Sequence, residues 1–233
     1  MKNIALTMAL LGSIAATPAS AAIQTVNGSF FDISYDDSLT GLFGTPTIVG
    51  NTVQWFPSGL PGFSAYSAGD GIQKASSTFA LTIAAKPDSD YKLTNFELQE
   101  SGDYSYFGSG TVGVGLGGQL RVTPLDPSSS TVISPIANTG TFTANAPLDF
   151  STKDWNATAA VDTTGLTKAN VTIENLLFAY TPPGSFPTQA FIEKKEAFLH
   201  VTVVPEAQTY MMLLAGLGLI GTIAYRRRQS QFD

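Results

Sequence analysis

The sequence predicts an all-β fold, an antiparallel β-sandwich or jelly-roll-like domain over residues 23–203, and two observations carry this expectation. Several segments alternate apolar and polar residues with a period of two, which buries one face of a strand and leaves the other wet. Clusters of Gly, Pro, Ser and Asn separate these segments, and no long helical period competes with them. About eight or more strands in one domain are typical of two packed sheets.

The strands follow in order along the chain. Residues 48–49 and 52–56 flank Gly50-Asn51, whose tolerance of positive φ predicts a tight hairpin. Phe79, Leu81 and Ile83 alternate with small or polar residues and mark the clearest strand. Further strands are expected at 30–35, 93–99, 139–144, 171–180 and 197–203.

Two strand segments leave alternatives open. Between residues 112 and 122 the apolar side chains take even positions and glycines take odd ones, so one face is nearly free of side chains. Gly117-Gly118 can either turn the chain there or bend one long strand. Leu176-Leu177-Phe178 breaks strict alternation, which indicates either a bulge or a strand buried on both faces.

The N-terminus has the pattern of a secretory signal peptide over residues 1–22. Met1-Lys2 is a short positive region, residues 4–16 are apolar but too few to span a bilayer, and small residues follow Pro18. We expect signal peptidase to cleave after Ala21 or Ala22. The remaining domain is therefore expected to be exported.

The C-terminus predicts a single transmembrane helix at residues 210–225. A helix over this apolar run would rise about 24 Å, short of a hydrocarbon core of roughly 30 Å, so the anchor is marginal. Arg226, Arg227 and Arg228 follow the run and are expected to stay in the cytoplasm with the tail 229–233. Everything before the helix then faces outward.

The segment 204–228 resembles the PEP-CTERM sorting signal of Gram-negative bacteria. Val204, Pro205 and Glu206 precede the short glycine-bearing helix and the arginine cluster, although Ala207 stands where a second proline is common. The resemblance implies recognition of Pro205 and Glu206 by an exosortase, a membrane-embedded cysteine protease, with the arginines as the stop-transfer and orientation cluster.

The resemblance also implies a route through the envelope. An inner-membrane-anchored precursor is expected to pass to the outer cell surface or to the exopolysaccharide of a biofilm matrix, which would then be a partner. Residues 30–36, 100–104 and 192–195 are similar to recurring elements of one β-rich group of these proteins. That likeness implies fold and destination and names no activity.

Composition excludes several functions. Residues 23–203 hold 8 Lys or Arg against 16 Asp or Glu, an acidic balance that argues against nucleic acid as a partner. Cysteine is absent, which excludes thiol catalysis, cysteine-ligated zinc, iron–sulfur clusters and disulfides. The only histidine, His200, is expected to point outward from a strand, so a Ser-His-Asp triad is not indicated.

Paired carboxylates are the catalytic chemistry that the composition permits most easily. Glu97, Glu100 and Asp103 form the densest acidic group, beside Tyr104 and Tyr106, and glycosidases need two carboxyls. The favoured interpretation places Glu97 on the wet face of a strand and residues 101–103 in a turn. The sequence therefore predicts no enzyme, with an exported glycosidase as the weakest alternative.

The main expectation is a non-enzymatic structural or matrix-associating protein. A carbohydrate-binding, lectin-like module is the runner-up, with Tyr104 and Tyr106 as the candidate sugar platform. No cofactor is expected. A structural calcium ion would have to use the carboxylates of Asp36 and Asp37, beside Ser38, and of Asp70, and these are better explained as solvated turn residues.

Overall fold

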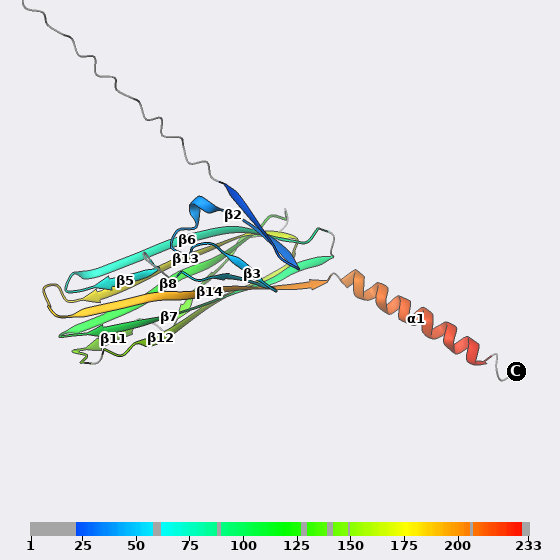
Figure 1. Cartoon of the computed structure of the whole chain (residues 1–233). Coiled ribbons are helices and arrows are strands. Elements are labelled where there is room, and N and C mark those ends of the chain that lie inside the picture. The colour runs from blue at the N-terminus through cyan, green and yellow to red at the C-terminus, as the bar shows by residue number, and fades with distance from the viewer. Residues whose placement is uncertain are drawn as a thin grey trace, which may run out of the picture.

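The structure is a computed structural model that describes residues 22–57, 62–87, 90–126, 130–138, 142–148, 150–205 and 207–229. Strands dominate these residues and form two antiparallel sheets packed face to face, followed by one α-helix (Figure 1). The all-β, antiparallel prediction is confirmed. Residues 1–21 lie outside the described part, so the predicted signal peptide is not seen.

The first sheet has the strand order β1-β2-β6-β13-β8-β11, with β9 paired to β8. Its strands are β1 (Ile23–Asn27), β2 (Phe31–Asp36), β6 (Gly71–Ala85), β8 (Thr111–Pro124), β9 (Val132–Pro135), β11 (Phe142–Asn145) and β13 (Lys168–Thr181).

The second sheet has the order β10-β12-β7-β14-β4-β3, with β5 paired to β14. Its strands are β3 (Thr47–Val49), β4 (Thr52–Trp55), β5 (Ser64–Ser67), β7 (Tyr91–Phe107), β10 (Ala137–Asn138), β12 (Lys153–Leu166) and β14 (Gln189–Pro205). A short 3₁₀ turn, η1 (Asp37–Leu39), follows β2.

The long strands alternate between the two sheets along the chain. Strands β6, β8 and β13 lie in the first sheet, whereas β7, β12 and β14 lie in the second. Each long strand therefore pairs with segments far away in sequence. Such pairing fixes the register through the buried faces, because a slip of one residue would expose them.

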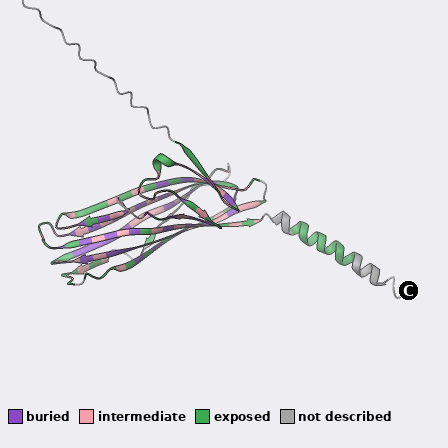
Figure 2. Ribbon diagram, in the orientation of Figure 1, coloured by how far each residue is buried: buried purple, intermediate pink, exposed green. Residues whose placement is uncertain are grey.

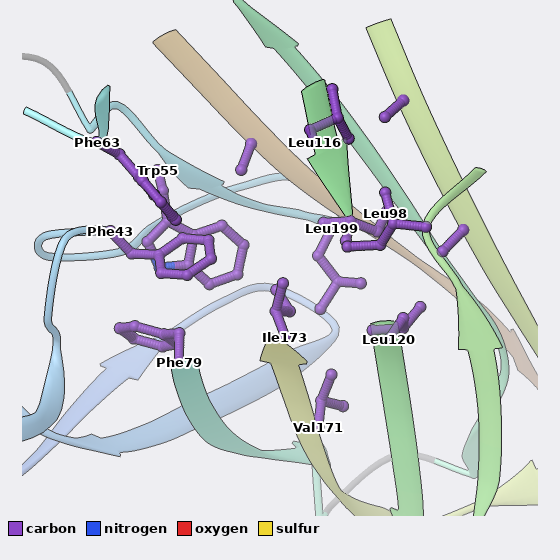
Figure 3. Packing of buried hydrophobic residues seen from close by; sticks show 14 of the residues in the cluster. Phe43, Trp55, Phe63, Phe79, Leu98, Leu116, Leu120, Val171, Ile173 and Leu199 are labelled. Atoms are coloured by element: carbon purple, nitrogen blue, oxygen red, sulfur yellow. The ribbon is translucent and has the colours of Figure 1, made fainter. Parts of the chain in front are cut away.

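One hydrophobic core fills the space between the sheets. Phe79, Leu81 and Ile83 are 1%, 3% and 0% exposed, which confirms the alternation expected for that strand. Figure 2 shows the same alternation of buried and exposed residues along most long strands. At one end of the core, edge-to-face rings form a cluster (Figure 3) of Phe43, Trp55, Phe63 and Phe79.

The predicted hairpin and the two segments that the sequence left open, at 117–118 and 176–178, all form regular strands. The predicted hairpin forms, with Gly50 at φ 63° between β3 and β4. Strand β8 runs unbroken through Gly117-Gly118. Leu177 is buried between the partly exposed Leu176 and Phe178, and the register of β13 with β6 and β8 is continuous, so the segment contains neither a bulge nor a doubly buried strand.

One turn prediction was wrong, and one strand was not predicted. The turn expected at residues 101–103 is instead the middle of β7, because Gly102 lets Trp155 pack against the backbone and the strand pairs on both sides. Strand β12 was missed, although Trp155, Ala157, Ala159 and Val161 alternate inward on it. Small alanines gave that alternation too little apolar contrast to stand out.

Helix α1 (Ala207–Gln229) occupies the region of the predicted transmembrane span 210–225. Within the described residues, however, no helix combines the length and the apolar character needed to cross a bilayer. The transmembrane part of the prediction is thus not supported. The apolar run is short, about 24 Å as a helix, and Gly216, Gly218 and Gly221 dilute it.

Candidate functional site

The sorting segment begins inside the second sheet. Residues 203–205 of β14 pair with residues 91–93 of β7, after a register irregularity between Thr202 and Val203. Helix α1 begins at Ala207, so Glu206 alone separates strand from helix. The final strand of the sandwich therefore runs almost directly into the helix (Figure 1).

The sorting segment is accessible at its start. Val204 is 38% exposed, and Pro205 is partly exposed at the strand end. Large apolar side chains between Met211 and Ile220 are exposed, so this part of α1 adds nothing to the core of the sandwich. Glu206 and the side chains of Arg226, Arg227 and Arg228 lie outside the described residues.

The predicted acidic trio does not form one site. Glu97 accepts a hydrogen bond from Gln99 Nε2 at 2.9 Å on the outer face of β7. Glu100 projects from the opposite face, fully buried, with its Oε1 2.7 Å from Lys194 Nζ. Because the two carboxylates lie on opposite faces of a sheet, they cannot flank one glycosidic bond.

Asp103 belongs to a separate ionic group on the outer face of the second sheet. It pairs with Lys195 and lies opposite Glu193 in the register of β7 and β14. Partial burial, followed by the charge and hydrogen bond of Asp103, raises the pKa of Glu193, while Lys195 opposes the shift. Two carboxyls that share a hydrogen bond lack the separation of about 5 Å or more used in glycosidases.

Tyr104 and Tyr106 are not a surface platform. They are 8% and 9% exposed, and the Tyr104 ring stacks on Phe142 with centroids 4.6 Å apart. Lys153 Nζ lies 4.7 Å from the centre of the Tyr106 ring and covers it further. Burial raises the pKa of Tyr104, as does its neighbour Tyr106. The sugar platform predicted from these residues is corrected: the rings pack in the end of the core.

The remaining sequence candidates have local partners. His200 Nδ1 lies 2.8 Å from Thr52 Oγ1, on the outward side of β14 as expected. Asp36 Oδ1 accepts from the backbone and hydroxyl of Ser38, and Asp37 bonds to Gln24. Among the described residues, no three His, Cys, Asp or Glu side chains gather where they could hold a metal ion.

A groove that the sequence did not predict lies on the outer face of the first sheet. It has a volume of about 650 Å³ and crosses β6, β13 and β8. Its lining comprises residues 76–78, 117–119 and 174–176. A Cβ at Gly117 would meet nothing within 4 Å, so missing side chains make the hollow.

The groove carries directional polar groups beside aromatic rings. Gln119 Nε2 donates to Glu174 Oε2 at 2.7 Å, and Arg121 lies 3.6 Å from the other carboxylate oxygen. Phe178 and Tyr180 continue the same outward row of β13, both partly exposed. Polar groups next to partly exposed rings are features that sugar-binding surfaces use.

Comparison with known families identifies the C-terminal segment. Residues 203–228 match the family model of the PEP-CTERM protein-sorting motif. The chain carries a PEP-CTERM sorting motif. This PEP-CTERM motif starts in the last paired residues of β14 and extends through most of α1. It confirms the resemblance noted in the sequence, and it implies exosortase-dependent sorting of an exported, membrane-anchored precursor.

Other comparisons add little to the PEP-CTERM assignment. No curated protein matches the sequence. A chain from the structure of infectious bursal disease virus, Gx strain, is 12% identical, with a TM-score of 0.27 over 76% of this chain and 42% of that one. A chain from the Gt strain is 10% identical, with a TM-score of 0.15 over 87% and 65%. This chain thus spans less than two thirds of either viral protein, and scores this low carry no argument.

Proposed function

We propose that this protein is delivered by PEP-CTERM sorting to the outer cell surface or the exopolysaccharide matrix, where it acts as a non-enzymatic structural or matrix-associating protein. One observation carries the proposal: the PEP-CTERM sorting motif begins at residue 203, inside the last strand of the sandwich. The acidic composition of residues 23–203 suits a soluble extracellular domain.

The geometry also explains how the domain would survive sorting. A cut at or just beyond Pro205 leaves the whole of β14 in the sheet and removes α1, whose described side chains are exposed. The released product would keep its complete core. Residues 204–205 sit at the end of the β7–β14 ladder, where pairs open at the lowest cost.

The test is the C-terminus of the mature protein, measured by intact mass in envelope and extracellular fractions of native cells with and without the sorting protease. We expect a product that ends near Pro205-Glu206 outside the cell, only when the protease is present. Full-length protein through Asp233 in the inner membrane of both strains would overturn the proposal.

Variants sharpen this test. A double variant that carries both Pro205→Ala and Glu206→Ala should not be processed. It lacks the recognition residues but keeps the helix and the arginines. Thr202→Ala is the matched control, since Thr202 is exposed on the same strand but precedes the matched segment. Equal processing of both proteins would argue against recognition at Pro205-Glu206.

The groove on the first sheet supports a second candidate function, a carbohydrate-binding module. Full-length protein would be applied to a glycan array, with Gln119→Ala and Phe178→Ala as the test variants. Glu97→Ala, on the outer face of the other sheet, is the control. Binding that falls at least tenfold only in Gln119→Ala, which changes the groove, and in Phe178→Ala, which changes the ring beside it, supports the module; binding that is absent or equal in all proteins rejects it.

A further inference from the structure

A lysine and a glutamate lie buried together in the core of this exported sandwich. Lys194 of β14 and Glu100 of β7 both have side chains with 0% exposure, and their Nζ and Oε1 atoms are 2.7 Å apart. Apart from this ionic contact, Nζ and both carboxylate oxygens have no hydrogen-bond partner among the described residues. The pair plays no part in the sorting segment or the groove.

The surroundings of the pair are aromatic. Lys194 Nζ lies 5.0 Å from the ring centres of both Phe43 and Phe63. The indole of Trp155 crosses Gly102 and donates to the backbone oxygen of Glu193 at 2.9 Å, beside Lys194. The amine and the carboxyl are thus held in one place by fully packed neighbours.

Such a site disfavours two full charges. Removing an ammonium and a carboxylate from water costs several kcal/mol per ion, and a pair without further hydrogen bonds recovers only part of it. Burial lowers the pKa of Lys194, although Glu100 opposes the shift. Transfer of one proton from Nζ to the carboxylate gives a neutral amine, which is a nucleophile, next to a neutral carboxylic acid.

We propose that Lys194 and Glu100 condense to form an isopeptide bond that cross-links β14 to β7. The Nζ lone pair forms a bond to the side-chain carboxyl carbon of Glu100, and a carbon–oxygen bond of that carboxyl breaks. The departing hydroxyl takes a proton from Nζ and leaves as water. An ammonium and a carboxylate therefore become one amide and one water, with no oxidant, reductant or other reactant.

The proximity of the amine and the carboxyl favours the condensation. Two groups held in reacting geometry behave as if present at roughly 10⁵ M or more, which offsets the barrier to condensation that free amines and acids face in water. The product replaces two buried charges with one neutral amide, which costs less to keep in an apolar core. Release of the water molecule adds a further favourable entropy.

The bond would reinforce a critical strand. The chain has no cysteine, so no disulfide can staple the domain outside the cell. Strand β14 ends in the PEP-CTERM motif, and a covalent tie from Lys194 to β7 would keep β14 in the second sheet when the terminus is pulled or cut.

Tryptic peptide mapping of the denatured protein purified from native cells tests the proposal. Trypsin cannot cleave after an acylated lysine, so the expected product joins peptide 93–121 to peptide 169–195, with the summed mass less one water. Fragment ions should place the link at Lys194 and Glu100. Separate peptides, with cleavage after an unmodified Lys194, would overturn the proposal.

Two variants serve as controls. Lys194→Met with Glu100→Leu replaces the pair by apolar residues of similar size and should yield only unlinked peptides. Lys195→Arg replaces the neighbouring lysine, which pairs with Asp103 on the outer face, by a residue after which trypsin still cleaves, and should leave the product that joins 93–121 to 169–195 in place. Loss of the linked product in Lys195→Arg would mean that the link uses Lys195 and not Lys194, which would overturn the proposal. The wild-type map decides the question even if the double variant fails to fold.

Discussion

The ring of Phe178 on β13 lies over Gly115 of β8, so close that a Cβ on Gly115 would stand 2.4 Å from Cζ of the ring. The two residues pair across the first sheet, and the glycine-rich face of β8 receives the aromatic row of β13. The glycines that leave one face of β8 almost without side chains therefore make room for this ring. At Gly115 the Phe178 ring packs directly on the backbone of β8, beside the groove.

Gly115→Ala should displace the Phe178 ring and lower the free energy of unfolding by about 1–2 kcal/mol, because the added methyl group overpacks the contact. Gly117→Ala is the matched control, since its Cβ would meet no atom within 4 Å. That variant should be neutral or slightly stabilising, because alanine restricts the unfolded chain. Urea unfolding of both variants measures the difference, and equal stabilities would contradict the packing described.

The two tryptophans should respond differently to replacement by phenylalanine. Both are almost fully buried, yet Trp155 Nε1 donates to the Glu193 carbonyl oxygen, whereas Trp55 Nε1 has no hydrogen-bond partner among the described residues. Trp155→Phe should cost more than Trp55→Phe by about 1–2 kcal/mol, because it alone removes a hydrogen bond. Chemical denaturation of the two variants tests this order, and the reverse order would reject it.

Period-two patterning predicted most of the sandwich because its strands have one wet and one dry face. It found the strands around Phe79, Leu81 and Ile83 and the hairpin at Gly50-Asn51. It failed at Gly102, since a glycine flanked by serine and aspartate looks like a turn unless the covering Trp155 is known. That contact is between strands, and no local pattern encodes it.

The candidate sites show the same limit. The sorting motif is continuous in sequence, so residues 204–228 could be recognised directly, and the family match confirmed them. The groove joins three strands, and the buried pair Lys194–Glu100 joins two, so neither was visible. A lysine inside an otherwise apolar-alternating strand was the only available signal for the pair.

Stability should depend on pH through Glu193. Partial burial and Asp103 raise its pKa above the ordinary value, so the folded chain holds this proton more tightly than the unfolded chain. The stability it contributes is complete below the unfolded pKa and is lost as the pH rises through the folded pKa. Glu193→Gln should therefore gain stability relative to wild type over the pH range that begins near the ordinary glutamate pKa of about 4.3 and extends upward from there.

Thermal unfolding of both proteins across that range measures the effect. Lys195→Gln is a useful comparison, because Lys195 opposes the pKa shift of Glu193 and its removal should make the wild-type pH dependence steeper. A constant difference between wild type and Glu193→Gln at every pH would show that Glu193 titrates alike in folded and unfolded chains.

The end of β14 sets where sorting can cut without damage. A chain that stops after Pro205 keeps every β14 pair with β7 and should unfold with the free energy of the full chain. A chain that stops after Val201 loses the pairs of residues 202–205 and the packing of Val203 against the core, and should be less stable by about 1–3 kcal/mol. Denaturation of the two truncated proteins separates these outcomes. Equal stabilities would mean that the last strand residues are dispensable, and the sorting protease could then cut well before Pro205 without harming the released domain.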